Sequence, residues 1–170
     1  MRQLRKVEIK KVMKEEKRDK EIYLLLENIQ YARNVAAIFR TADAAGVKKM
    51  YLTGITQKPP FGKELKQASR NKEESMDWVY KETSGEVIQT LKKLGFVIVA
   101  IEITDKAVRL DKLADALKNE KKICFVAGSE VFGVNKATLE RSDISVYIPM
   151  YGRGASLNVA TSVGVALFSI

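Results

Sequence analysis

Residues 148–170 read IPMYGRGASLNVATSVGVALFSI, and this stretch decides which fold the chain can adopt. It begins as the end of a buried strand, passes through a polar loop with two glycines, and finishes as an apolar helix over 158–169. No later residues follow in the sequence to cover that helix. We therefore expect another surface to bury it, and we expect the polar loop at its start to form part of a site.

Apolar strand patterns and helical patterns alternate along the rest of the chain. Several strand patterns lack polar alternation, which is typical of strands buried on both faces of a parallel sheet. Residues 54–72 contain Pro59-Pro60 and many lysines, and they are predicted to be a long loop. The fold class is therefore α/β, with a parallel sheet covered by helices on both faces. The predicted strands are 21–26, 49–53, 77–81, 96–101, 123–127 and 144–148, and the predicted helices are 35–45, 85–94, 110–117, 135–141 and 158–169.

The composition excludes several classes of site. The 170 residues suit one domain, and they include no histidine and one cysteine, Cys124. Catalytic Ser-His-Asp and Cys-His arrangements and histidine-bearing zinc sites are therefore excluded. No apolar run reaches the ~18 residues of a membrane span, and the N-terminus lacks the apolar stretch of a signal peptide. A cytoplasmic protein without membrane contact is the expectation.

The net charge of +9 is concentrated in two segments. Residues 1–20 hold nine Lys/Arg and four Asp/Glu, residues 57–72 hold five and one, and the remainder holds 16 of each. Two basic segments suit contact with nucleic-acid phosphates, although basic runs are often merely solvated. We divide the chain into a basic arm, 1–20, and a domain, 21–170. The candidate nucleic-acid-binding residues are Arg5, Lys6, Lys10, Lys11, Lys63, Lys66, Arg70 and Arg153.

Three polar loops follow predicted strands, namely 28–40, 128–130 and 152–158. Ligands of open parallel sheets bind at loops beyond the carboxyl ends of strands. The spacing of a dinucleotide-binding loop fails here, because Leu157 stands where Gly152-Arg-Gly154 would need a third glycine. No G-x-x-x-x-G-K-[ST] phosphate loop occurs in the sequence. NAD and ATP sites of these kinds are therefore excluded.

Each polar residue in these loops also has a purely structural explanation. Arg40 fits a surface arginine of an amphipathic helix, and Asn34 fits the N-cap of that helix. Glu130 fits a carboxylate at a helix entry, and Ser156 or Asn158 fits the cap of the last helix. Only the joint placement of these residues at one edge of a sheet indicates a site.

In three motifs, the sequence resembles the TrmH (SpoU) family of RNA ribose 2′-O-methyltransferases, in the SPOUT superfamily. The motifs are NVAAIFRTADAAG at 34–46, GSEVFG at 128–133, and IPM at 148–150 followed by SLNVA at 156–160. The resemblance covers about residues 21–170. It implies a trefoil-knot fold, S-adenosylmethionine as cofactor and a homodimer, in which a partner subunit covers the last helix.

The resemblance also implies roles for individual residues. Gly128, Ile148, Met150, Leu157 and Asn158 would hold the cofactor, with glycines at 128, 152 and 154 permitting tight turns. Arg40 would be catalytic, and we interpret its role as binding an RNA phosphate and positioning the ribose, because guanidinium stays protonated. Asn34, Glu130, Ser156 and Asn158 would orient Arg40 and the cofactor. No metal is implied.

The expected activity is methylation of a ribose 2′-hydroxyl in structured RNA, with tRNA slightly favoured over rRNA. Thr161-Ser162 depart from the small apolar residues usual in the family, and the separate RNA-binding domain of many relatives has no counterpart in the sequence. Two alternatives stay open. One is a non-catalytic RNA-binding protein on the same fold, and the other is a methyltransferase acting on a base.

Overall fold

A computed structural model describes residues 1–15 and 18–170, so two residues of the predicted arm lie outside the described residues. Within these residues the chain forms one sheet of seven strands, in the order β3-β2-β1-β6-β4-β7-β5. Every neighbouring pair is parallel. The strands are β1 Glu21–Glu27, β2 Lys49–Thr53, β3 Trp78–Lys81, β4 Val97–Ile101, β5 Val108–Arg109, β6 Lys122–Ala127 and β7 Ile144–Tyr147.

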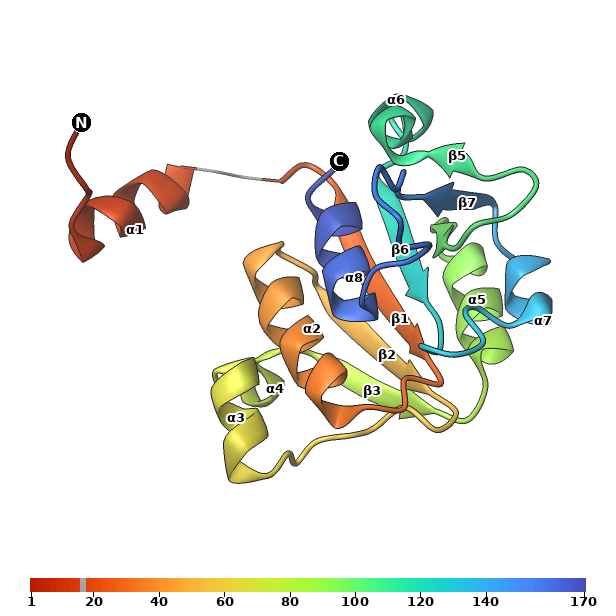
Figure 1. Cartoon of the computed structure of the whole chain (residues 1–170), viewed down its shortest axis with the longest axis horizontal. Helices are drawn as coiled ribbons and strands as arrows, with labels where there is room; N and C mark the ends of the chain where they lie inside the picture. The colour runs from red at the N-terminus through yellow and green to blue at the C-terminus, as the bar shows by residue number, and fades with distance from the viewer. Residues whose placement is uncertain (16–17) are drawn as a thin grey trace.

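Helices cover both faces of the sheet, as the continuous apolar strands predicted (Figure 1). The long helix α2 packs on α8 and α3 over one face, and α5 packs with α7 over the other. The helices are α1 Lys6–Glu15, α2 Ala32–Ala44, α3 Lys63–Ser69, α4 Lys72–Ser75, α5 Ser84–Lys93, a 3₁₀ turn Leu110–Lys112, α6 Leu113–Ala116, α7 Lys136–Leu139 and α8 Val159–Leu167.

Strand β1 shows how the sequence builds two cores at once. Ile22, Leu24 and Leu26 are fully buried in the core beneath α2 and α8. Leu25, on the opposite face of the strand, is fully buried in the core beneath α5. Successive side chains of a strand point to opposite faces, so a strand covered on both sides must be apolar at every position. Cys124 on β6 is likewise fully buried and belongs to the core.

Four parts of the structure differ from the sequence-based predictions. The segment 54–72 is not one continuous loop, because it contains α3 and the start of α4. The short edge strand β5 was not predicted, and the helix predicted over 110–117 begins as a 3₁₀ turn. The loop prediction was wrong because it relied on the prolines and lysines of this segment. The residues KELKQAS, which form α3, mostly favour a helix.

The fourth correction concerns the start of α2. Asn34 was predicted as its N-cap, but the helix begins at Ala32 with Tyr31 in the cap position. Asn34 is therefore the third helical residue and is buried. Gly46 does end the helix as predicted, with φ of 72°.

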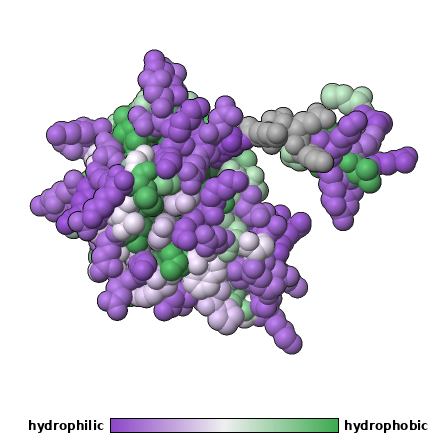
Figure 2. Space-filling view, turned by 180° about the vertical axis from the view of Figure 1, so that it is seen from behind, coloured by the Kyte–Doolittle hydropathy of each residue, from purple (hydrophilic) through white to green (hydrophobic). Residues whose placement is uncertain are grey.

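The surface of the molecule is uneven. Figure 2 shows that the side facing away from the viewer of Figure 1 carries mainly hydrophilic side chains, with apolar surface only between them. By contrast, Val165 on α8 and Phe168, just after its end, are exposed although both are large and apolar. No helix among the described residues has the length and apolar character needed to cross a lipid bilayer.

Candidate active site

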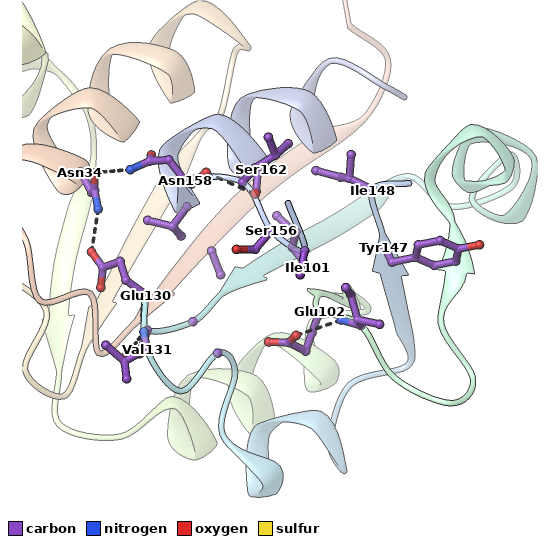
Figure 3. Close-up of a pocket in the computed structure, with 18 of the residues that line it drawn as sticks. Asn34, Ile101, Glu102, Glu130, Val131, Tyr147, Ile148, Ser156, Asn158 and Ser162 are labelled. Carbon is purple, nitrogen blue, oxygen red and sulfur yellow. Dashed lines mark hydrogen bonds between the residues drawn. The ribbon is translucent and has the colours of Figure 1, made fainter. Parts of the chain in front are cut away.

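A cavity of about 630 Å³ lies at the carboxyl ends of three neighbouring strands, β6, β4 and β7. Residues 101–103, 127–131 and 146–148 extend from these strand ends into its wall. The first turn of α2 and the loop that leads into α8 complete the lining. Figure 3 shows this cavity with its polar side chains. Its position is the one predicted for ligands of parallel sheets.

A hydrogen-bond chain links the three sequence motifs at one side of this cavity (Figure 3). Asn158 Nδ2 donates to Asn34 Oδ1 at 3.0 Å, and Asn34 Nδ2 donates to Glu130 Oε1 at 2.7 Å. Because a carboxylate can only accept, Asn34 must turn its amide nitrogen toward Glu130 and its oxygen toward Asn158. The structure thus brings together residues that are 96 and 124 positions apart in sequence.

Glu130 also fixes the start of α2. Its carboxylate accepts hydrogen bonds from the backbone amides of Gln30, at 3.0 Å, and Tyr31, at 3.4 Å. Partial burial raises the pKa of Glu130, but the hydrogen bonds from Asn34 and from these amides outweigh it, and the net pKa is lowered. The carboxylate therefore stays charged at neutral pH and holds the cavity wall in place.

Replacing Glu130 with glutamine is expected to lower the free energy of unfolding at neutral pH. At acid pH the substitution is expected to have little effect on it. The pKa in the folded protein lies below the ordinary 4.5, so the charged form favours folding above pH 4.5. That contribution disappears as the pH falls through the lowered pKa. Urea unfolding of both proteins at about pH 7 and about pH 3 measures the difference. If the two proteins differ in free energy of unfolding by the same amount at both pH values, the stabilisation by Glu130 comes from packing and not from its charge.

Glycine is required at position 128, where two backbone segments of one loop lie in close contact beside the cavity. A Cβ placed on Gly128 would lie 2.2 Å from the carbonyl carbon of Gly133 and 2.3 Å from the amide nitrogen of Val134. The loop between them is closed by paired backbone hydrogen bonds that join Ser129 and Gly133. Only glycine allows this close approach of two backbone segments.

The loop after β7 supplies a second wall. Ile148, Met150, Ser156 and Leu157 line the cavity, as the motif predicted. Asn158 caps α8, because its side-chain oxygen accepts a hydrogen bond from the amide of Ala160 at 2.9 Å. The same side chain donates to Asn34 at the cavity wall, so it serves both the helix and the hydrogen-bond chain. Contacts within the chain do not require glycine at 152 or 154, because a Cβ at either would meet nothing within 4 Å and neither has a positive φ. Their predicted close approach to a cofactor stays a prediction.

The structure does not bring Arg40 to the cavity. Arg40 is exposed on α2, six residues beyond Asn34, and it is not among the residues lining the cavity. Arg33 lines the cavity instead, although sequence reasoning passed over it. Glu102, at the end of β4, was missed as well. Neither residue lies in the quoted motifs, so no sequence pattern singled them out.

The predicted RNA-binding residues lie on separate parts of the molecule. Lys6, Lys10 and Lys11 belong to α1, which Figure 1 draws away from the sheet. Lys63 and Lys66 belong to α3, followed by Arg70, but Lys66 forms an ion pair with Glu74 at 3.0 Å. Arg5 and Arg153 are exposed. The described residues contain no group of three or more acidic or cysteine side chains suited to hold a metal ion.

Comparison with known proteins identifies the family to which this chain is similar. The model of the SpoU rRNA Methylase family matches residues 21–168. A tRNA (guanosine(18)-2′-O)-methyltransferase from Aquifex aeolicus is 32% identical over 156 residues, which are 90% of this chain and 70% of the relative.

Two solved structures show the likeness in three dimensions. The AdoMet-bound rRNA methyltransferase from Sinorhizobium meliloti superposes with a TM-score of 0.79 at 26% identity, over 89% of this chain and 56% of that one. The A. aeolicus TrmH/SpoU tRNA modifying enzyme gives a TM-score of 0.74 at 27% identity, over 95% of this chain and 81% of that one. Since the family model matches nearly every residue after the arm, this chain belongs to the SpoU rRNA methylase family.

Proposed function

We propose that this chain transfers a methyl group from S-adenosylmethionine to a ribose 2′-hydroxyl of structured RNA. The observation that carries the proposal is the hydrogen-bond chain Asn158–Asn34–Glu130, which joins all three motifs at the wall of the cavity beside β6, β4 and β7. The relatives support it, since the A. aeolicus protein is named for 2′-O methylation of tRNA and the S. meliloti structure contains AdoMet.

The residues present suit this cofactor. The cavity volume lies within the ~300–1,000 Å³ usual for small-molecule sites. Its lining combines apolar side chains such as Ile101 and Met150 with Gly128 and Leu157, and with polar groups at Asn34 and Ser162. An adenosine needs apolar walls for its base and a few polar groups for its edges, and both are available here.

In the proposed site, backbone groups around Gly128, Ile148, Met150 and Leu157 hold the adenosine. When bound, the cofactor supplies an electrophilic methyl group on a sulfonium. Asn34, Glu130, Ser156 and Asn158 hold the acceptor ribose and the cofactor in line, and this alignment is the main contribution a rigid site can make to such a displacement. Arg40 binds an RNA phosphate bidentately, which agrees with its exposure outside the cavity.

Calorimetric titration with S-adenosylmethionine, followed by methyl transfer to separate tRNA and rRNA fractions, tests the proposal. We expect cofactor binding and transfer to RNA, with tRNA the better substrate. No cofactor binding would contradict the proposed function and leave a non-catalytic RNA-binding protein. Transfer to rRNA alone would overturn only the choice of substrate.

We also propose that the chain works as a knotted homodimer in the cytoplasm. Thr161, Val165 and Phe168 lie at positions i, i+4 and i+7 of one exposed surface around α8, and such a surface suits burial against a second copy. Light scattering of the purified protein is expected to give about twice the chain mass, and the Phe168→Glu variant is expected to give a monomer. A monomeric wild-type protein at micromolar concentration would refute the homodimer.

The arm is proposed to contribute electrostatically to RNA binding. Replacing Lys6, Lys10 and Lys11 with glutamine is expected to weaken RNA binding and to reduce the salt slope by about 0.7–0.9 for each RNA phosphate that the arm no longer neutralises. The matched control replaces three exposed lysines outside both basic segments, Lys93, Lys118 and Lys121. Equal slopes for the two triple variants would show that the arm lysines are only solvated.

Truncation is the poorer test of the arm, because its last residues hold the domain together. Arg18 donates hydrogen bonds to the carbonyl oxygens of Leu167, at 2.8 Å, and Ile170, at 3.2 Å. Lys20 donates to the carbonyl oxygens of Leu117 and Glu120. Removing residues 18–20 would therefore disturb two helix ends as well as the charge.

A further inference from the structure

The loop that follows β6 carries an exposed aromatic residue beside the cavity. Val131 and Phe132 are 64% and 82% exposed, although both are large and apolar. Glu130, immediately before them, accepts the hydrogen bond from Asn34 at the cavity wall. Figure 3 shows Glu130 and Val131 on the same side of the cavity as Asn34. Phe132 therefore stands next to the hydrogen-bond chain, on the side where the proposed site holds its reacting groups.

The backbone of this loop is held in place by its own hydrogen bonds. The amides of Ser129 and Gly133 each donate to the carbonyl oxygen of the other, at 3.0 and 2.9 Å. The hydroxyl oxygen of the buried Ser129 also accepts from the amides of Val131, at 3.2 Å, and Phe132, at 3.4 Å. Because the backbone of the loop is already ordered, little freedom remains to be lost when a ligand packs on Phe132.

Exposed aromatic side chains gather around this cavity. Among residues 1–15 and 18–170, the exposed aromatic residues are Tyr31, Phe132, Tyr151 and Phe168. Tyr31 lines the cavity, and Phe132 and Tyr151 each directly follow a residue that lines it. Single exposed apolar residues are normal on a protein surface, but three aromatic residues around one cavity indicate a contact surface.

The ligand that suits this surface is an unpaired nucleobase. Bases of single-stranded RNA stack on aromatic side chains, whereas a base within a duplex is already stacked between its neighbours. The net charge of +9 attracts a polyanion, and the exposed Arg33 places a positive charge at the cavity wall. Aromatic faces combined with positive charge favour a nucleic acid over an apolar peptide.

We propose that Phe132 is a stacking platform for an unpaired nucleobase next to the methylated ribose. The substrate then carries its target nucleotide in a single-stranded loop and not within a helix. The proposal rests on the proposed function, because the base belongs to the RNA whose ribose enters the cavity. Phe132 acts as a positioning residue, since it holds the base and does not touch the reacting atoms.

The test measures the binding of two labelled RNA probes by fluorescence anisotropy. One probe is a hairpin with a single-stranded loop, and the other is a fully paired duplex of the same length. We expect the wild-type protein to bind the hairpin more tightly than the duplex. Phe132→Ala is expected to bind the hairpin about tenfold more weakly, because it loses one stacked base, and to bind the duplex as the wild-type protein does.

Two further readouts distinguish stacking from charge and from loop structure. Stacking on Phe132 neutralises no phosphate, so Phe132→Ala is expected to keep the wild-type salt slope for the hairpin. Phe132→Trp keeps an aromatic platform and is expected to retain the affinity for the hairpin. The fluorescence of the added indole is expected to be quenched by the hairpin and not by the duplex.

A matched variant and a second ligand serve as controls. Leu94→Ala removes another exposed apolar side chain, from a residue that does not line the cavity, and it is expected to change neither RNA affinity. Calorimetry with S-adenosylmethionine is the second control. Phe132 does not line the cavity, so Phe132→Ala is expected to bind the cofactor as the wild-type protein does.

The outcomes separate the inference from the proposed function. Equal weakening of hairpin and duplex binding in Phe132→Ala, or unchanged hairpin binding, would overturn the inference, as would a wild-type protein without preference for the hairpin. Loss of cofactor affinity would assign Phe132 to the cofactor, and conversion of a dimer to a monomer would assign it to the contact between two copies. Either result would also overturn the inference. Failure of the wild-type protein to bind the cofactor or either RNA would instead contradict the proposed function.

Discussion

Replacing Arg40 with alanine is expected to lower methyl transfer at least about 100-fold while cofactor affinity changes less than twofold. Arg40 is exposed on α2 and does not line the cavity, so the variant leaves the cofactor walls intact. What it removes is a bidentate clamp for an RNA phosphate, and loss of positioning of this kind costs about two orders of magnitude in rate. Single-turnover transfer to RNA and calorimetry with S-adenosylmethionine give the two readouts.

The matched control for Arg40 is Arg141→Ala. Arg141 is exposed just after α7 and donates a hydrogen bond to the carbonyl oxygen of Ala137 in its own turn, so the variant removes the same charge elsewhere. It is expected to retain wild-type transfer. Parallel loss of transfer and cofactor binding in Arg40→Ala would give Arg40 a structural role and would contradict its assignment to the RNA.

The second large effect is expected from Gly128→Ala. The added methyl group would lie 2.2–2.3 Å from backbone atoms of Gly133 and Val134, and a backbone clash cannot be relieved by turning a side chain. Forcing atoms into a packed site typically costs about 1–3 kcal/mol, and the loop must move away from the cavity. We expect a less stable protein, measured by thermal unfolding, with no detectable cofactor binding.

Gly152→Ala is the control for that substitution. Gly152 lies in the loop after β7, between the cavity-lining residues Met150 and Ala155, but a Cβ there would meet nothing within 4 Å and the residue has no positive φ. Alanine at this position is expected to leave stability unchanged or to raise it by about 0.4–1 kcal/mol, because the unfolded chain loses freedom. Wild-type cofactor binding by Gly128→Ala would show that the loop does not shape the site.

The strands could be predicted because a strand buried on both faces is recognisable from its own residues. Strands such as β2, β4 and β6 are continuous apolar runs bounded by polar residues or glycine, and their predicted bounds agree with the structure to within one residue. A strand buried on both faces needs nothing from the rest of the chain to be recognised. The parallel sheet and its helical layers follow directly from that pattern.

The first residue of α2 could not be predicted, because the residue that stabilises the start of this helix lies far away in the sequence. Tyr31 and Ala32 carry no helix-start pattern, and the amides there are satisfied by Glu130, about a hundred residues away. Asn34 was misread as a cap because capping is the usual role of asparagine before an apolar helix. Only the folded chain shows that Asn34 faces Glu130 and Asn158 instead.

Glu102 and Arg33 are cavity residues that sequence patterns could not identify. Each is a single charged residue beside an element of ordinary composition, and a surface position is the usual explanation. The topology sets both at the cavity, because β4 lies between β6 and β7, and α2 begins at the same edge. Such placements depend on strand order, which local sequence does not specify.

The most direct test of the central claim is to incubate the purified protein with RNA and methyl-labelled S-adenosylmethionine, and then to hydrolyse the RNA with alkali. Alkaline cleavage needs a free 2′-hydroxyl, so a 2′-O-methylated ribose leaves the label in a resistant dinucleotide. We predict label in alkali-resistant dinucleotides, and none with Arg40→Ala. Label confined to mononucleotides would place the methyl group on a base and contradict ribose 2′-O methylation by this chain.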